Sequence, residues 1–226
     1  MSQKQEQPKA YILLGPPGSG KSTQADIFKR EFGCEHVDMG SALRRAAQEP
    51  TPFGENLSRI MNEEGGLVAD EIMQAVLEQE IRKIAPDRPV IIDGAPRRES
   101  QIHEVLSVLN RHGKDFNKAI FVELSEEDSV DRISRRFSCT DCGAKLILGK
   151  NFDSVGDRCP QCGGRVSQRA DDTAEGVRKR WQVFHDETLP VLKYFEEQGQ
   201  LLRVSGASDP ETIFKDIRSG ISEESA

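Results

Sequence analysis

The sequence has no long apolar run, and only 6% of its 226 residues are aromatic. None of its apolar stretches approaches the roughly 20 residues that a membrane-spanning helix needs. The first nine residues are polar and lack the apolar segment of a signal peptide. No internal repeat or low-complexity tract is evident. These absences predict a cytoplasmic protein that has no membrane partner.

An excess of positive charge is also lacking, because 31 lysines and arginines face 38 aspartates and glutamates, for a net charge of −7. This balance argues against a general nucleic-acid binder, so we expect no nucleic-acid partner. Arginines nevertheless occur in local groups, which indicates a confined anionic ligand. About half of them should lie in solvated ion pairs, Arg135 and Arg178 among them. The grouped arginines are Arg44, Arg45, Arg97, Arg98, Arg132, Arg135, Arg136, Arg169, Arg178 and Arg180.

A glycine-rich segment at 15–23 fits the pattern G-x-x-x-x-G-K-[ST], with Gly15, Gly20, Lys21 and Ser22 on the fixed positions. An apolar run precedes it at 10–14, and apolar residues at roughly helical spacing follow it to position 32. In this context the glycines let backbone N–H groups surround a phosphate, the lysine reaches the outer phosphates and the serine hydroxyl can ligate Mg²⁺. A plain turn would need all of these features to coincide. We therefore predict a loop that binds a nucleoside triphosphate, although the pattern leaves the acceptor open.

Five short apolar runs alternate with segments of helical periodicity, which is typical of the α/β class. The pattern predicts a P-loop, doubly wound, five-stranded parallel sheet that binds its ligands at the carboxyl ends of the strands. Polar residues at those ends, in segments 15–22, 38–44 and 93–97 and at Gly206, should converge on one crevice. The predicted strands are 10–14, 35–38, 90–92, 119–122 and 201–204. The predicted helices are 23–32, 70–84, 101–109, 128–136, 172–185 and 210–217, with shorter helical pieces around 42–43 and 57–61.

Two acidic positions are open to a structural or a functional interpretation. Asp172 and Glu175 have the spacing of a capping box, which predicts that Asp172 caps the helix at 172–185. Asp93 ends an apolar strand next to Gly94, a position that favours a functional carboxylate.

The cysteines form two Cys-x₂-Cys knuckles that are separated by sixteen residues. Their spacing suits four thiolates around one tetrahedral Zn²⁺, although iron fits the same ligands. Disulfides are the weaker alternative in a cytoplasmic chain. Four cysteines leave no open position on the metal, so we expect a structural site that stiffens a segment too short for a core of its own. The predicted ligands are Cys139, Cys142, Cys159 and Cys162, whereas Cys34 is expected to be a small buried side chain.

From about Ala10 to the last helix, the sequence resembles the adenylate kinases of the long-lid form, in which the lid binds zinc. The motifs that carry the resemblance are GPPGSGKST (15–23), LR (43–44), GLVADE (66–71), DGAPR (93–97) with Gln101, DR (131–132) with Arg136, the cysteine knuckles, and RADD (169–172) with Arg180. The resemblance implies a monomer that reversibly transfers the γ-phosphoryl of Mg-ATP to AMP, giving two ADP. It also implies a core (8–38, 70–136 and 171–226), a mobile monophosphate-binding flap (39–69) and a zinc lid (137–170).

The resemblance assigns roles to individual residues. The ATP-binding set is Gly15, Gly18, Ser19, Gly20, Lys21, Ser22, Thr23, Arg132, Arg136 and Ala207. The AMP-binding set is Met39, Arg44, Gly66, Val68, Gly94, Arg97, Gln101, Arg169 and Arg180. The catalytic set is Lys21, Arg97, Arg136, Arg169 and Arg180. Mg²⁺ is assigned to Ser22 and, through water, to Asp93, and the tether of the lid hinge to Asp171 and Asp172.

Three positions depart from the family pattern, all on the acceptor side. Met39 stands where threonine is common, Ser41 where aspartate is common, and Ala95 where phenylalanine is usual. These departures leave open a kinase for GMP, CMP or UMP. A more remote alternative is a nucleotide-gated assembly factor whose zinc segment contacts RNA or protein. Such a segment should interleave basic and aromatic residues, yet between Cys139 and Cys162 only Lys145, Lys150, Arg158 and Phe152 qualify, offset by Asp141, Asp153 and Asp157.

Overall fold

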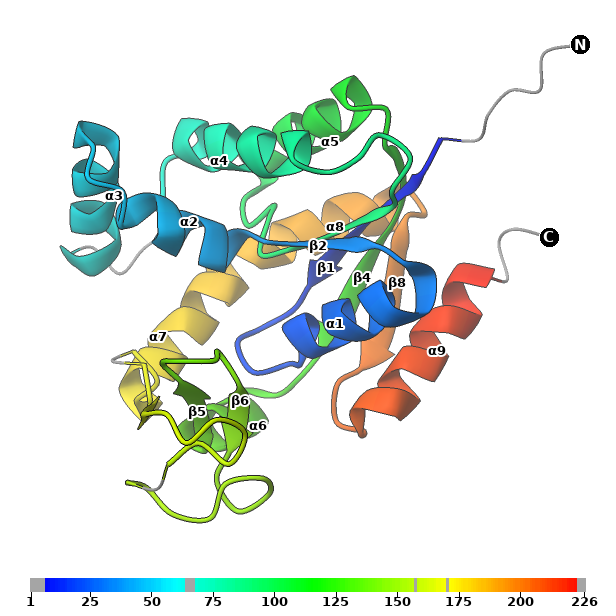
Figure 1. Ribbon diagram of the computed structural model, residues 1–226. Coiled ribbons are helices and arrows are strands. Elements are labelled where there is room, and N and C mark those ends of the chain that lie inside the picture. The colour runs from blue at the N-terminus through cyan, green and yellow to red at the C-terminus, as the bar shows by residue number, and fades with distance from the viewer. Residues whose placement is uncertain (1–6, 64–67, 157, 170, 223–226) are drawn as a thin grey trace, which may run out of the picture.

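The structure is a computed structural model, and it describes residues 7–63, 68–156, 158–169 and 171–222. Its centre is a five-stranded sheet with the strand order β2-β3-β1-β4-β8, in which every neighbouring pair is parallel (Figure 1). The predicted α/β class and the five-stranded parallel sheet are therefore confirmed. The strands are β1 (Lys9–Leu14), β2 (Glu35–Asp38), β3 (Val90–Asp93), β4 (Asp115–Glu123) and β8 (Leu201–Ser205).

Helices cover both faces of this sheet because its apolar side chains alternate between the two faces. On β1, for example, Leu13 belongs to one apolar cluster, whereas Ile12 and Leu14 belong to the other. The first cluster includes buried residues of α1 (Lys21–Phe32) and α9 (Pro210–Ser222). The second includes those of α2 (Met39–Ala47), α4 (Asp70–Arg82), α5 (Ile102–Arg111) and α8 (Leu189–Glu197). The remaining helices are α3 (Pro52–Glu63), α6 (Glu126–Ser134), α7 (Ala174–Val183), a 3₁₀ turn (Glu99–Gln101) and a π-helical turn (Phe184–Thr188).

The region around α7 differs from the prediction in two ways. Thr173, not Asp172, caps α7, because its hydroxyl accepts the backbone N–H of Gly176 at 3.1 Å. The predicted capping role of Asp172 is therefore wrong, and its carboxylate is free to bind other groups. The helix also continues through the π-helical turn into α8, which the sequence pattern did not predict.

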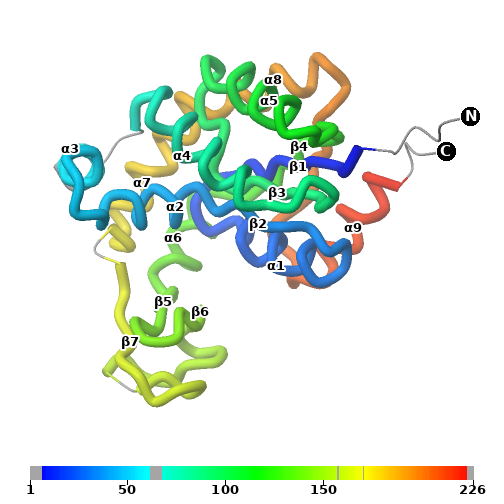
Figure 2. Tube along the Cα trace, turned by 45° about the horizontal axis from the view of Figure 1, so that its top comes forward, coloured from blue at the N-terminus to red at the C-terminus, as the bar shows by residue number. Residues whose placement is uncertain are grey.

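The lid segment (137–170) carries a second, antiparallel sheet with the order β6-β5-β7. Figure 2 shows it projecting from the main sheet. Its strands are β5 (Arg136–Cys139), β6 (Lys145–Ile147) and β7 (Val166–Ser167). Phe137, Leu146 and Phe152 are buried together here with two of the cysteines, and the two phenylalanine rings lie 5.5 Å apart. The expectation that this segment has no core of its own is therefore wrong, although the core is small.

Among the described residues, none of the helices combines the length and the apolar character needed to cross a membrane.

A buried lysine ties the start of β4 to the loop between α4 and β3. Lys114 is 3% exposed, and its ammonium donates to the carbonyls of Ala85, Pro86 and Arg88 at 2.8–2.9 Å. Burial lowers the pKa of Lys114, because it disfavours the charged ammonium. The three carbonyl oxygens still require an N–H donor at this position. The lysine is thus a structural element on the side of the sheet opposite to the carboxyl ends of the strands.

We predict that Lys114→Met lowers the free energy of unfolding by about 3 kcal/mol, because three buried carbonyls lose a charged donor. Lys9→Met is the matched control, since Lys9 forms only an exposed ion pair with Asp115, and its loss should cost at most about 1 kcal/mol. Urea unfolding of the two variants measures both values. Equal costs would contradict the structural role of Lys114.

Candidate active site

The glycine-rich loop joins β1 to α1 and exposes the start of that helix. Gly20 precedes the helix with φ +93°, a left-handed conformation that suits glycine. Gly15 is required for a different reason, since a Cβ there would press on the Val122 carbonyl and the Ser19 hydroxyl. The first N–H groups of a helix have no partner inside it, and together with the helix dipole they favour an anion. The predicted phosphate-binding geometry is therefore present in the structure.

Lys21 folds back onto this loop. Its ammonium lies 2.8 Å from the carbonyl oxygens of both Gly15 and Pro16 and 3.4 Å from the Ser19 hydroxyl. Burial lowers the pKa of Lys21 to about 8, although the nearby Asp93 carboxylate opposes this change. A phosphate at the loop would replace these neutral carbonyls with a full negative charge and favour the protonated amine.

Ser22 and Asp93 meet where β3 ends. The Ser22 hydroxyl donates to the Asp93 carboxylate at 2.7 Å, and Asp93 is 6% exposed. Strand register places Asp93 opposite Leu13 on one side and Asp38 on the other. A hydroxyl and a carboxylate are the hard oxygen ligands that Mg²⁺ prefers, directly or through water. The pair fits the metal position that the sequence predicted.

Two further polar residues lie at this edge: Asp38, which the sequence placed in the converging segment 38–44, and His36, which sequence reasoning missed. The His36 imidazole lies 3.9 Å from the Asp93 carboxylate, and Asp38 caps α2. Both belong to the short strand β2, whose position beside β3 is set by the sheet order. The sequence signal that could have identified His36 is the polar composition of the predicted strand at 35–38.

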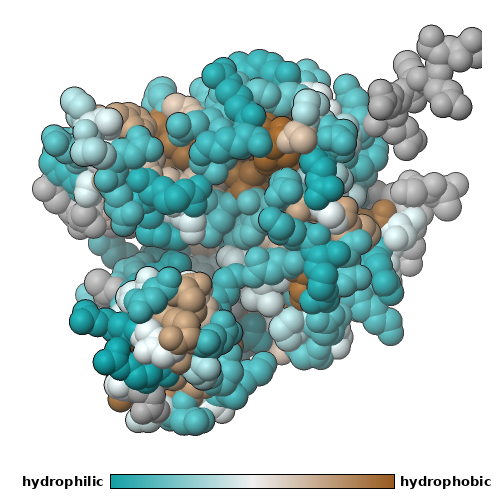
Figure 3. Space-filling model, viewed as in Figure 1, coloured by the Kyte–Doolittle hydropathy of each residue, from teal (hydrophilic) through white to brown (hydrophobic). Residues whose placement is uncertain are grey.

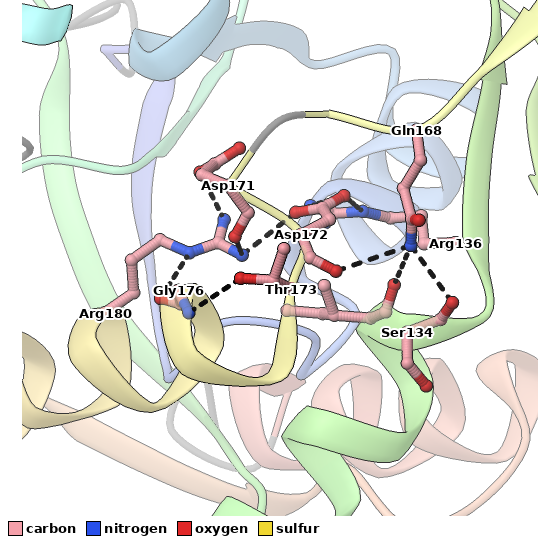
Figure 4. Close-up of polar contacts among 9 residues, drawn as sticks. Ser134, Arg136, Gln168, Asp171, Asp172, Thr173, Gly176 and Arg180 are labelled. Carbon is pink, nitrogen blue, oxygen red and sulfur yellow. Dashed lines mark hydrogen bonds and ion pairs between the residues drawn. The ribbon is translucent and has the colours of Figure 1, made fainter.

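Buried Asp172 binds two of the predicted arginines at once (Figure 4). Its carboxylate receives Arg136 in a bidentate pair at 2.7–3.0 Å and Arg180 at 2.9 Å, with 1% of the aspartate side chain exposed. Arg180 also forms an ion pair with Asp171 at 3.0 Å. Arg136 begins the first lid strand and Arg180 lies on α7, so this cluster joins the lid segment to the core. Bidentate carboxylate contacts hold guanidinium groups in a fixed orientation.

Several of the predicted arginines influence one another electrostatically. Desolvation lowers the pKa of Arg97, although this residue stays solvent-exposed, and Asp93 and Asp38 oppose the effect. Desolvation also lowers the pKa of Arg169, which is exposed as well, and the charges of Arg44 and Arg136 lower it further. These charge effects indicate that the arginines lie near one another. Figure 3 shows the surface hollowed between the lid segment and the region around α2 and α4.

The remaining ATP-side residues also meet. The Arg132 guanidinium donates to the Ala207 carbonyl at 3.3 Å, which brings together two residues of the expected ATP-binding set. Their contact lies between α6 and the loop that follows β8.

On the acceptor side, the Gln101 amide is largely occupied by the chain itself. It is 2% exposed; its oxygen accepts from the backbone N–H of Arg97 at 2.7 Å and of Arg98 at 3.4 Å, and its nitrogen donates to Asp70 at 2.8 Å. One amide N–H remains for a ligand. Met39 and Val68 are buried nearby in the same apolar cluster as Ala95. The expected AMP residue Gly66 lies outside the described residues.

The four predicted metal ligands converge in the lid segment. All four sulfur atoms lie within 4.8 Å of one another, with Cys139 to Cys162 at 3.5 Å and Cys142 to Cys159 at 3.7 Å. Metal–sulfur distances of about 2.3 Å in a tetrahedron place sulfurs about 3.8 Å apart, so the set fits one tetrahedral ion. Hydrogen bonds from the backbone N–H of Cys142, and then of Asp141, lower the pKa of Cys139 to about 7. Backbone N–H groups also favour the thiolates of Cys142 and Cys162, but desolvation and the neighbouring sulfurs outweigh them and raise both pKa values, that of Cys162 to about 12.

The chain was compared with known proteins. A family model described as "Adenylate kinase" matches residues 13–200. The adenylate kinase of Kosmotoga olearia is 35% identical, over 91% of this chain and 95% of the relative. The adenylate kinase of Syntrophomonas wolfei subsp. wolfei is 34% identical, over 92% of this chain and 96% of the relative, and that of Syntrophotalea carbinolica is 34% identical, over 93% and 97%. The motif order, the geometry of the cleft and these matches agree, and the chain belongs to the adenylate kinase family.

Proposed function

We propose that the chain transfers the γ-phosphoryl group of Mg-ATP to AMP and catalyses the reverse reaction. The observation that carries this proposal is a group of mutually influencing cations beside the phosphate loop: Arg97 and Arg136 act on Lys21, Arg180 acts on Arg97, and Arg136 acts on Arg169. Lys21 lies on the loop itself, and Asp172 holds Arg136 and Arg180. Phosphoryl transfer needs little covalent chemistry from the protein. The protein has to position the reacting groups in line and to neutralise the charge on the phosphoryl group in transfer. A cluster of fixed cations beside a P-loop supplies both.

Each group has a distinct task in this proposal. Lys21 and the loop amides hold the β- and γ-phosphates, while Arg132 and the Ala207 segment flank the ATP base. Arg44 and Arg97 hold the acceptor phosphate. Arg136, Arg169 and Arg180 stabilise charge on the group in transfer, and the Asp172 carboxylate fixes two of them. Ser22 and Asp93 would hold Mg²⁺, which neutralises phosphate charge when it is bound.

We further propose that the four cysteines bind a structural zinc ion. Their sulfur spacing and their number support this, since a complete set of thiolates leaves no position for water or substrate. The small core around Phe137 and Phe152 is then completed by the metal. All five cysteines are free, which suits the reducing cytoplasm in which we place the enzyme.

The same reasoning supports a monomer with two mobile units, the flap (39–69) and the lid (137–170). The lid segment has its own sheet and core, so it can move as one body. Residues of the proposed site come from one chain, and each of the two nucleotides has its own set of contacts there. A second copy is not needed to complete the site.

A coupled assay of ADP formation with AMP, GMP, CMP and UMP tests the proposed function. We predict that AMP has the highest kcat/KM, with a raised KM and weaker rejection of the other monophosphates than the family usually shows, because one Gln101 N–H carries the base contact and Ala95 is small. Gln101→Ala should lower kcat/KM for AMP roughly tenfold and reduce the ratio of this kcat/KM to that of the other monophosphates. Ser100→Ala is the control, since it disturbs the same Asp70 carboxylate without facing the base. A higher kcat/KM for another monophosphate would show that this monophosphate, and not AMP, is the preferred acceptor.

We predict that kcat/KM for ATP falls as the pH rises through about 8. The pKa of Lys21 is lowered to about 8, so the amine is protonated below that pH and loses its charge above it, and kcat/KM reports the free enzyme. Lys21→Arg keeps the charge at all pH values and should abolish this limb. Lys21→Met should reduce kcat/KM by roughly 10³ below pH 8, and its deficit relative to the unmodified enzyme should shrink above that pH, where Lys21 itself is uncharged. An unchanged alkaline limb in Lys21→Arg would assign the limb to another group.

We predict close to one equivalent of zinc in the purified, reduced protein. Cys159→Ser should lower both the zinc content and the melting temperature, because three thiolates hold the metal less tightly and its binding energy stabilises the fold. Cys34→Ala is the control: it removes a buried thiol outside the cluster and should retain zinc. Elemental analysis that finds iron, or no metal, would overturn the assignment.

A further inference from the structure

The carboxylate at the end of β2 is connected to Arg44 through one hydroxyl. Asp38 caps α2, accepting the backbone N–H of Ser41 at 2.9 Å and its side-chain O–H at 2.6 Å. The Arg44 guanidinium then donates to the same Ser41 hydroxyl oxygen at 2.9 Å. The three side chains form a chain of hydrogen bonds that runs from the strand end to the arginine.

The direction of these bonds is set by chemistry. A hydroxyl has one O–H and can donate one hydrogen bond. Because the Ser41 O–H donates to Asp38, the Ser41 oxygen can only accept the hydrogen bond from Arg44. Burial alone would raise the pKa of Asp38, but the two Ser41 hydrogen bonds and the nearby Arg44 charge hold that pKa below its ordinary value. An ionised carboxylate polarises the hydroxyl and strengthens its bond to the guanidinium.

We call the hydrogen bonds that join Asp38, Ser41 and Arg44 the relay. The backbone beside this relay leaves room for the Arg44 guanidinium. A Cβ at Gly40 would lie 3.3 Å from both an Arg44 Nη atom and an Asp38 carboxylate oxygen, so the arginine passes close over the helix start. Asp38 also acts on Lys21 and Arg97, whose charges it favours. The relay therefore directs Arg44 toward the same region as the other cations.

We propose that Asp38 and Ser41 are positioning residues for Arg44. They hold its guanidinium so that its remaining N–H groups face the phosphate of the acceptor nucleotide. A long arginine side chain otherwise loses rotamer freedom on binding, at a cost to affinity. The proposal rests on the role of Arg44 given under Proposed function.

The chain contains a matched control for ordinary helix capping. At the start of α9, the Asp209 carboxylate accepts the backbone N–H of Thr212 at 3.1 Å and its hydroxyl at 2.6 Å. Within the part of the chain that the structure describes, the Thr212 hydroxyl bonds to no arginine. At both helices the aspartate accepts the N–H and the hydroxyl of the residue three positions later, and at α9 Asp209 also accepts the backbone N–H of Glu211 at 3.1 Å. The bond from an arginine to the capping hydroxyl is the feature that α2 adds.

The test compares Ser41→Ala with Thr212→Ala, using steady-state kinetics and calorimetric AMP binding. Ser41→Ala should raise KM and Kd for AMP roughly tenfold, the size expected for one hydrogen bond to a charged group, and leave KM for ATP unchanged. Ser41→Thr keeps the hydroxyl and should restore AMP binding. Thr212→Ala should leave both KM values unchanged while losing a similar amount of stability.

A double-mutant cycle separates positioning from structure. Ser41→Ala should have no further effect on AMP binding in an Arg44→Ala background, because the relay acts only through that arginine. An equal effect in both backgrounds, or an AMP KM for Ser41→Ala that matches Thr212→Ala, overturns the relay and leaves the role of Arg44 intact. Unchanged AMP binding by Arg44→Ala overturns that role and the relay with it.

Discussion

The arrangement of the cleft depends on one buried carboxylate. Asp172 neutralises Arg136, at the start of the lid sheet, and Arg180, on α7, with 1% of its side chain exposed. Removing one member of a buried ion pair leaves an uncompensated charge and costs ~3–5 kcal/mol. Here the loss would also weaken the link between the lid sheet and α7, because Arg136 and Arg180 both bind this carboxylate. Thr173 makes this possible by taking over the cap of α7.

Asp172 does not cancel all the positive charge that it organises. The pKa values of Lys21, Arg97 and Arg169 are lowered from their ordinary values, first by desolvation and then by neighbouring arginines, so keeping these groups charged costs free energy. A triphosphate and a monophosphate return that free energy when they bind. Perturbed groups of this kind concentrate at functional sites, where a ligand supplies the missing charge. The acidic overall balance of the chain thus coexists with a strongly cationic cleft.

Sequence reasoning predicted the elements that strong local patterns control. The glycine loop, the five apolar strands and the two cysteine knuckles each have a short, nearly complete signature, and sheet order then brings their ends together. It failed where two nearby residues could perform the same local task. Asp172 and Thr173 both suit a helix cap, and the two arginines that bind the buried Asp172 carboxylate decide between them. The α8 helix was missed because it follows a π-helical turn without a break, and the Gln101 contacts depend on the tertiary position of Asp70.

The departures from the family pattern look different once their neighbours are known. Ser41 stands where the family commonly has an aspartate, which from the sequence seems to remove a charge from the acceptor side. In the structure the Ser41 hydroxyl donates to the carboxylate of Asp38, which lies three positions earlier at the end of β2. The charge is displaced rather than lost, and Arg44 retains an acceptor on its own helix. Met39 and Ala95 have no such compensation, since both are buried apolar side chains. In the proposed acceptor site, the uncompensated departures therefore concern buried apolar side chains, while a carboxylate linked to Arg44 is retained.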